Sequence, residues 1–266
     1  MLGLHRHPSP AAVPSRVVAF APRPAVQAMM RAALPRRHAR VVVARTASAF
    51  RTSFGAGLVD AALVDLDAPG EQGSQAARLA RDFPTVAFLG VSAFRAADSG
   101  CIARCAELGF VDILAERMDG VVLPHAIATH SFSVRFAGTF AEAPPVLGLA
   151  TPLQAAAWRC IVARAGRPVR TQELARMLGL TREHLSRTFS AGQAPNLKRV
   201  IDLVRLLAAA ELAKNPRYDV GDVARVLGYA SSSHLSATAQ RVVGTKASSL
   251  ASLRAVDIIG RFRWKA

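Results

Sequence analysis

The sequence predicts two domains of different fold class, an α/β domain followed by an all-α domain. Between residues 16 and 133, short apolar runs alternate with segments of helical periodicity, which is typical of a parallel sheet covered by helices. Between residues 153 and 255, apolar residues recur at helical spacing only. A helix–turn–helix pattern also occurs twice in this second part, and Gly228 lies 49 residues after its counterpart Gly179.

The first domain is expected to contain five parallel strands. The strands are predicted at residues 16–20, 39–44, 59–66, 85–91 and 110–115. The helices between and after them are predicted at 24–34, 47–55, 73–82, 98–108 and 118–131. Strands that are apolar throughout are buried on both faces, so we expect helices on both sides of the sheet.

The two helix–turn–helix copies have matching small residues. The copies read ELARMLGL at 173–180 and DVARVLGY at 222–229. Ala175 and Ala224 fall where the two helices of each copy must approach closely. Gly179 and Gly228 fall at the turn, where glycine accepts a positive φ at little steric cost. One such copy would fit any helix hairpin, but two on a basic chain indicate DNA binding.

The positive charge is concentrated in the second part of the chain. The net charge of the whole protein is +16. Residues 1–150 hold 15 arginines and 11 acidic residues, whereas residues 151–266 hold 19 lysines and arginines and 7 acidic residues. Such a field favours polyanions as partners and speeds encounter with them.

Several classes of protein do not fit the composition. The chain has three cysteines, Cys101, Cys105 and Cys160, which is too few for a disulfide framework and fits a reducing cytoplasm. No spacing suggests a metal site or a nucleophile–base–acid set, so we expect no metal, no cofactor and no enzymatic activity. No apolar run of about 18 residues predicts a membrane span.

Three segments are expected to lie outside the two domains. Residues 1–15, rich in Pro, Ala and His, predict a disordered N-terminus. Residues 136–152 contain Gly, Ala and the pair Pro144-Pro145, which predicts a linker or extended arm between domains at 16–135 and 153–255. Residues 256–266 form a basic tail, either a frayed terminus or an arm that reaches a DNA groove.

The first domain resembles the receiver domain of two-component response regulators, which has a flavodoxin-like fold. The likeness lies in the five-strand order and in the stretch DAALVDLDAPG at 60–70. Receivers end the third strand with a phosphoaccepting Asp, which Asp65 matches, followed by a Pro-Gly turn.

The other parts of a receiver site are missing. The resemblance implies an acidic pair for Mg²⁺ after the first strand, but Ala21 and Pro22 stand there. It implies a Lys after the fifth strand, where the nearest match is Glu116, and a Ser or Thr near Gly90 or Ser92. We therefore expect Asp65 to be a vestigial phosphoacceptor, and the domain to serve dimerisation or the docking of a partner or small molecule.

The second domain resembles the DNA-binding domain of the AraC/XylS family of transcription regulators. The segments on which this resemblance rests are 173–189, 201–207 and 223–229. The resemblance extends over about 100 residues. A long helix is predicted at 197–213 between the two copies. A stiff helix there would fix the separation of two recognition helices, which must be about 34 Å to enter successive major grooves of B-DNA.

The resemblance places DNA contacts on the second helix of each copy. In the first copy the matching positions are Arg182, Glu183, Ser186 and Arg187, and in the second they are Ser232, Ser233, His234 and Ser236, with Arg241 and Lys246 as phosphate contacts. Arg187 suits a two-donor contact with guanine or a phosphate. The second copy departs from the family, since Ala237 stands where an Arg is usual. We expect the first copy to read sequence and the second to clamp backbone.

The sequence therefore predicts a cytoplasmic, nucleoid-associated transcription regulator. The expected partner is double-stranded DNA, the expected assembly is a homodimer, and RNA polymerase is a further candidate partner. Two alternatives stay open. The first is an architectural protein of low sequence specificity, which binds any duplex about equally. The second is an interaction module whose helix–turn–helix copies no longer bind DNA.

Overall fold

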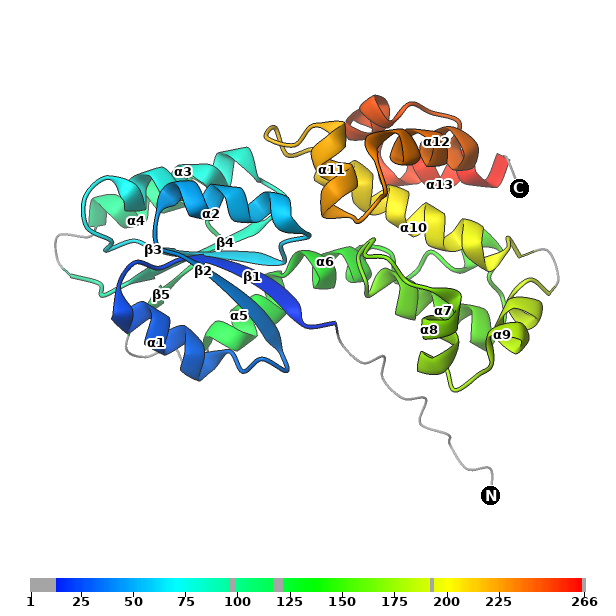
Figure 1. Cartoon of the computed structure of the whole chain (residues 1–266), viewed down its shortest axis with the longest axis horizontal. Coiled ribbons are helices and arrows are strands. Elements are labelled where there is room, and N and C mark those ends of the chain that lie inside the picture. Colours follow the sequence, from blue (N-terminus) through cyan, green and yellow to red (C-terminus); the bar gives the residue numbers. More distant parts are fainter. Residues whose placement is uncertain (1–12, 96–98, 117–121, 192–193, 265–266) are drawn as a thin grey trace, which may run out of the picture.

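The computed structural model describes residues 13–95, 99–116, 122–191 and 194–264. Figure 1 shows a sheet with helices on both faces at one end of the molecule, and a wholly helical domain at the other. The disordered start that the sequence predicts for residues 1–15 falls mostly on residues outside these ranges, although Ser15 already belongs to the first strand.

The first domain is built on a five-stranded parallel sheet. Its strands are β1 (Ser15–Phe20), β2 (Ala39–Ala44), β3 (Ala61–Asp65), β4 (Ala87–Ser92) and β5 (Asp112–Ala115). They lie in the order β2-β1-β3-β4-β5, and every neighbouring pair is parallel. This is the flavodoxin-like order, so the predicted fold class is confirmed. All five residues of β3 are buried, as expected for a central strand covered on both faces.

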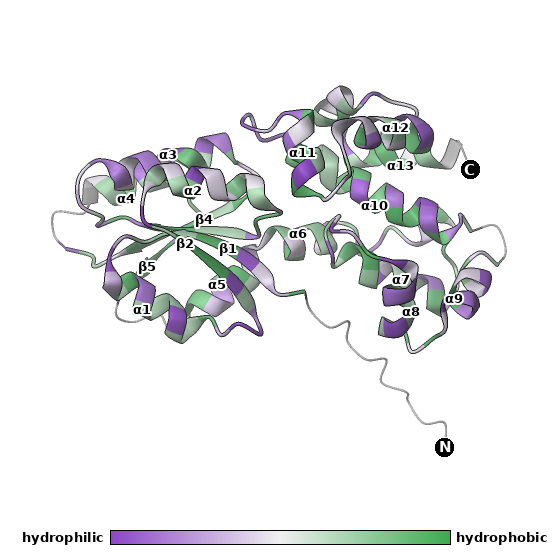
Figure 2. Ribbon diagram, in the orientation of Figure 1, coloured by the Kyte–Doolittle hydropathy of each residue, from purple (hydrophilic) through white to green (hydrophobic). Residues whose placement is uncertain are grey.

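The helices divide between the two faces of the sheet. They are α1 (Pro24–Ala33), α2 (Ala47–Ser53), α3 (Gln72–Asp82), α4 (Ser99–Glu107) and α5 (Val122–His130). The helices α1 and α5 share one apolar core with the sheet, and α2 and α3 share the other with the 3-10 turn η1 (Phe54–Ala56). Figure 2 shows the strands as mostly hydrophobic and the outward faces of α3 and α9 as hydrophilic.

The second domain is helical and is organised around one long helix. Its helices are α6 (Phe132–Thr139), α7 (Pro152–Val162), α8 (Thr171–Met177), α9 (Arg182–Phe189), α10 (Leu197–Leu212), α11 (Val220–Val226), α12 (Ser232–Val243) and α13 (Ala255–Trp264). Twelve of the 16 residues of α10 are buried, and this helix shares one apolar core with both helix–turn–helix copies.

The prediction of an extended arm at 136–152 is wrong. Residues 136–139 belong to α6, and Pro145–Leu147 form the 3-10 turn η3. Phe132, Phe136 and Phe140 are buried in the core of the helical domain, because their spacing of four places them on one face of the helix. The Trp158 indole nitrogen also donates a hydrogen bond of 2.8 Å to the Phe140 carbonyl, which ties this segment to α7.

The C-terminal segment is also more ordered than predicted. Residues 255–264 form α13, and the Phe262 side chain is fully buried in the core of the helical domain. The Arg199 guanidinium lies 5.0 Å from the centre of the Phe262 ring. The frayed-terminus and groove-reaching alternatives therefore do not describe the chain as far as Phe262, while Lys265 and Ala266 lie outside the described residues.

A buried ion pair joins the two domains at the amino edge of the sheet. Asp60 precedes β3 and has no exposed surface, and its Oδ2 lies 2.5 Å from an Arg167 nitrogen in the segment before α8. The other nitrogen of the Arg167 fork donates to the Ser133 hydroxyl on α6, and that hydroxyl in turn donates to Asp60. A buried carboxylate is tolerated when it is paired and fully hydrogen-bonded in this way.

The turn between α10 and α11 makes a second set of contacts with the same edge. The side-chain amide of Asn215, which is fully buried, accepts from the Thr85 backbone N–H at 3.1 Å and donates to the Thr85 hydroxyl at 2.8 Å. The Tyr218 hydroxyl donates to the Phe54 carbonyl at 2.9 Å, and its ring packs edge-on against Phe83. The α/β domain thus contacts the helical domain at the turn that precedes α11, the first helix of the second helix–turn–helix.

Candidate nucleic-acid interface

The first helix–turn–helix consists of α8 and α9. Gly179 adopts a φ of +70° between them, as the sequence predicts for the turn. The Thr181 hydroxyl accepts a hydrogen bond of 3.2 Å from the His184 N–H, which caps the start of α9. Leu174 and Leu185 have no exposed surface and hold the two helices together, leaving the other face of α9 exposed.

The second helix–turn–helix consists of α11 and α12. Gly228 has a φ of +65° at the turn, and Ser231 caps α12 by accepting from the His234 N–H at 3.1 Å. Ser232 is the first residue of the helix.

Arg205 of α10 fixes the turn of the second copy, a role that sequence reasoning missed. Its guanidinium carbon lies 3.8 Å from the centre of the Tyr229 ring, and one of its nitrogens donates to the Leu227 and Gly228 carbonyls. These carbonyls end α11 and need donors. Arg205 and Tyr229 lie 24 residues apart in the sequence, so no local pattern links them.

Most of the predicted contact residues are exposed. The residues whose side chains are exposed are Arg182, Glu183, Ser186 and Arg187 on α9, and Ser232, Ser233, His234 and Arg241 on α12. Ser236 is half-buried. His184 of α9 is also exposed. Both recognition helices therefore present polar residues to solvent along the predicted face.

A basic groove connects the starts of the two recognition helices. It has a volume of about 490 Å³, with Arg182 of α9 on one side and His234 and Arg241 of α12 on the other. Its remaining walls come from α10 and from residues beside the start of α8. The lining residues are Val169, Arg170, Thr171, Gln172, Arg182, Lys198, Ile201, Asp202, Arg205, His234 and Arg241.

The charge of this groove is strongly positive. Five lysines and arginines line it, against the single carboxylate of Asp202. Within the part of the chain that the structure describes, no hydrogen bond or ion pair engages the side chains of Arg170, Arg182 or Lys198. An adjoining hollow of about 450 Å³ shares Lys198 and Arg241 with the groove and adds Arg199. Unpaired cations in a concave surface attract phosphate groups.

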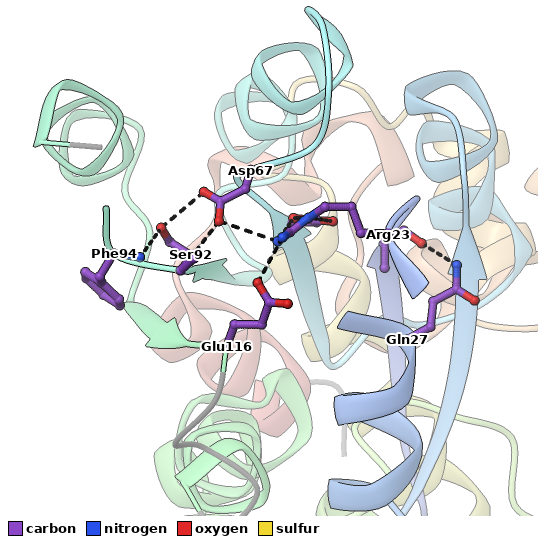
Figure 3. A network of polar contacts seen from close by, with 9 residues as sticks. Arg23, Gln27, Asp67, Ser92, Phe94 and Glu116 are labelled. Atoms are coloured by element: carbon purple, nitrogen blue, oxygen red, sulfur yellow. Dashed lines mark hydrogen bonds and ion pairs between the residues drawn. The ribbon is translucent and has the colours of Figure 1, made fainter. Parts of the chain in front are cut away.

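The carboxyl edge of the sheet holds a different cluster, centred on Arg23 (Figure 3). The Arg23 Nε and one terminal nitrogen donate to the Asp65 carboxylate at 2.9 and 2.6 Å. The other terminal nitrogen lies 2.9 Å from Glu116, and Asp67 is 3.6 Å from the guanidinium. Burial opposes the charge on Arg23, but the hydrogen bonds and attraction from Asp65 and Glu116 outweigh it and raise the arginine's pKa.

The residues of the Arg23 cluster differ from those that the receiver resemblance implies at this edge of the sheet. The expected metal ligands are replaced by Ala21 and Pro22, and Arg23 directly after them supplies a fixed cation instead. Glu116, which stands where the resemblance implies a Lys, accepts a hydrogen bond from Arg23. Ser92 is buried and its hydroxyl donates to Asp67, which also accepts from the Ala93 N–H at 2.7 Å. Sequence reasoning missed Arg23 because its partners lie 42 and 93 residues away.

The cysteines are free thiols. Cys105 and Cys160 are buried and Cys101 is half-buried. Burial raises the pKa of the Cys105 thiol to about 12, and the neighbouring Cys101 adds to the shift. Within the described ranges, no three His, Cys, Asp or Glu residues come together as metal ligands would. None of the helices described is long and apolar enough to cross a membrane.

The geometry defines a class of protein: a doubly wound α/β domain joined to a helical domain with two helix–turn–helix units on a common basic face. Residues 174–252 match the family model described as a helix-turn-helix domain, and this domain is of the AraC type. The predicted resemblance of the second domain is thereby confirmed. The match covers α9–α12 and most of α8.

Two solved structures resemble the chain. One is a response regulator from Thermotoga maritima, 18% identical, which covers 44% of this chain and 97% of that chain with a TM-score of 0.38. The other is full-length FixJ from B. japonicum, 14% identical, which covers 80% of this chain and 97% of that chain with a TM-score of 0.39. No curated protein matches the sequence.

Proposed function

We propose that this protein is a sequence-specific regulator of transcription that binds double-stranded DNA with α9 and α12 in successive major grooves. The observation that carries this proposal is the basic groove between the starts of the two recognition helices. In a complex of this kind the DNA backbone crosses from one major groove to the next in front of α10. Arg170, Arg182 and Lys198 are then available to its phosphates.

The two recognition helices present different polar side chains to DNA. Arg187 on α9 is exposed and has the paired donors that suit guanine O6 and N7, and Glu183 can accept from cytosine N4. The start of α12 offers Ser232, Ser233 and His234, which are weaker donors that suit backbone contacts. We therefore propose that the first copy reads most of the sequence and that the second mainly holds the backbone.

The test is selection of duplexes from a randomised pool by the full-length protein, followed by titration of the selected and scrambled duplexes. The proposal expects one enriched motif with contacts about one helical turn apart and a preference of at least about 10³ over scrambled DNA. Equal affinity for both duplexes would favour the architectural alternative. Failure to shift any duplex at low salt would favour an interaction module without DNA binding.

We further propose that Asp65 does not accept a phosphoryl group. Both of its oxygens bind the Arg23 guanidinium, and the side chain has no exposed surface from which to attack a phosphodonor. Incubation of the full-length protein with acetyl phosphate and Mg²⁺ is expected to leave its mass unchanged. An added phosphoryl group mapped to Asp65 would contradict the proposal.

The proposed role as a transcription regulator also implies an oligomeric state and a cellular location for the protein. We propose that the chain acts by binding, as a homodimer on cytoplasmic, nucleoid-associated DNA, with RNA polymerase as a candidate partner. Support for a dimer comes from the edge strand β2, where the Val43 side chain is apolar and 44% exposed. Sedimentation of the full-length protein at several concentrations tests this, and a monomer at all of them would refute it.

A further inference from the structure

The basic groove contains one acidic side chain, that of Asp202 on α10. Its Oδ2 lies 2.9 Å from a terminal nitrogen of Arg241 on α12. The Asp202 side chain is 12% exposed, whereas that of Arg241 is 54% exposed. The carboxylate is thus fixed in the groove wall, and the longer side chain reaches to it from the rim.

The other cations of the groove are in different situations. Arg205 is engaged with the Tyr229 ring and with the carbonyls at the end of α11. Among the described residues, Arg170, Arg182 and Lys198 have no acidic partner. Arg241 is therefore the cation of the groove that a carboxylate holds, and any phosphate that approaches it meets both a positive and a negative group.

We propose that Asp202 is a selectivity residue that competes with DNA phosphates for Arg241. On a duplex without the binding site, sequence-independent phosphate contacts hold the protein loosely, and Arg241 stays with Asp202. On a duplex with the site, contacts from α9 and α12 fix the register and bring a phosphate into the groove. Arg241 then exchanges the carboxylate for this phosphate, so the contact forms only on the correct sequence.

The geometry permits this exchange at low cost. An ion pair with a half-exposed arginine is weak, because water screens the attraction. The Arg241 side chain is long and reaches Asp202 from another helix, so it can turn to a phosphate without movement of the backbone. The proposal rests on the proposed function, since it assigns a role within the same DNA-binding face.

The experiment compares the full-length wild type with Asp202→Asn on two duplexes, one selected by the wild type from a randomised pool and one scrambled. Binding is measured by fluorescence anisotropy over a range of salt concentrations. On scrambled DNA the variant is expected to gain one phosphate contact, which steepens the slope of log K against log salt by about 0.9 and raises affinity about eightfold near 0.1 M salt. On the selected duplex the slope should not change, so the preference for the site falls.

Two further variants separate exchange from general repulsion. In an Arg241→Ala background, Asp202→Asn should leave the slope on scrambled DNA unaltered, because the cation to be released is gone. A gain that persists there would overturn the proposal. Glu211→Gln removes a charge from the other end of α10, where Glu211 pairs with Lys214 at 2.6 Å, and should change neither slope nor preference.

The outcomes also separate this inference from the proposed function. If the wild type binds no duplex or selects no sequence, the proposed function fails and the role of Asp202 fails with it. If the wild type discriminates and Asp202→Asn has the same slopes and preference, only the role of Asp202 is refuted. Asp202→Glu keeps the carboxylate and should retain most of the wild-type preference, provided that its melting temperature shows an intact fold.

Discussion

Two arginines that look alike in the sequence are used in opposite ways. Arg187 is exposed on α9 and has no acidic partner among the described residues, so its donors are available to a ligand. Arg23 donates to Asp65 and Glu116, and its donors are consumed within the protein. The difference depends on which carboxylates the fold brings near each side chain, which residue type alone does not reveal.

Because Arg187 is exposed, we expect its side chain to contact DNA directly. Arg187→Ala should weaken binding to a selected duplex by about 1–3 kcal/mol and relax the preference at one base pair, because a two-donor contact with guanine is lost. Anisotropy titrations on duplexes altered at single positions measure this. Equal weakening on selected and scrambled DNA would instead assign Arg187 to a phosphate. Arg104→Ala, an exposed arginine on α4, is the control and should not change binding.

Loss of Arg23 should destabilise the α/β domain. Arg23→Met leaves the buried Asp65 without its partner beside Asp67 and Glu116, and breaking such a pair costs about 3–5 kcal/mol. Adding Asp65→Asn should recover part of this loss, because the uncompensated charge is removed. Urea unfolding of the three proteins provides the measurement. Equal stabilities of the wild type and the single variant would show that the cluster has no structural role.

At the level of elements, the helices and strands were largely predictable. All five strands were located from apolar runs, and the long helix was predicted at 197–213 and observed at Leu197–Leu212. Burial on both faces of a strand leaves a continuous apolar run, and burial of one helix face leaves a periodic one. Both signals are local, which is why they can be recognised without the fold.

The elements that were missed have weaker or conflicting local signals. Gly138 and the pair Pro144-Pro145 led to the prediction of a linker, although Phe132, Phe136 and Phe140 already had helical spacing. Similarly, the charged residues near the C-terminus hid the fully buried Phe262 of α13. In both segments, packing against the rest of the helical domain decided the outcome, as tertiary contacts override local composition.

Two glycines with similar backbone angles provide a matched test of packing. Gly166 and Gly179 have φ values of +81° and +70°. A Cβ on Gly166 would lie 2.4 Å from the Ala208 Cβ of α10, whereas a Cβ on Gly179 meets nothing within 4 Å. Both alanine variants carry the strain of a positive φ, of about 1 kcal/mol, but Gly166→Ala must also move α10.

Gly166→Ala is therefore expected to be less stable than Gly179→Ala by about 1–3 kcal/mol. Thermal and urea unfolding of the two variants measure the difference. Equal destabilisation would mean that strain in the backbone dominates and that α10 can shift freely at Ala208. A larger loss in Gly179→Ala would contradict the packing argument.

At the level of the whole molecule, the interface at the amino edge of the sheet couples the two domains. Asp60 and Arg167 form its buried ion pair, while Asn215 and Tyr218 add hydrogen bonds from the turn after α10. Neither the pairing nor the edge involved was predictable, since the partners are far apart in the sequence and each residue alone fits an ordinary surface.

Removal of this ion pair should uncouple the unfolding of the domains. Both tryptophans, Trp158 and Trp264, belong to the helical domain, so tryptophan fluorescence follows that domain alone, whereas far-UV circular dichroism follows both. The wild type should give coincident melting curves with the two probes. Arg167→Met leaves the buried Asp60 carboxylate without its cationic partner, so the curves should separate, with a total loss of about 3–5 kcal/mol. Coincident curves in the variant would show that the remaining contacts suffice.

The same ion pair bears on how the chain folds during its synthesis. Asp60 leaves the ribosome 107 residues before Arg167, which at about 5–20 residues per second is a delay of roughly 5–20 seconds. Until then the Asp60 carboxylate can accept hydrogen bonds from water, from the Arg16 N–H and, once it is synthesised, from Ser133, but it lacks the cation that it pairs with in the folded protein. The amino edge of the sheet must therefore stay hydrated throughout this interval. Water leaves it only when the helical domain has been synthesised and packs against the α/β domain.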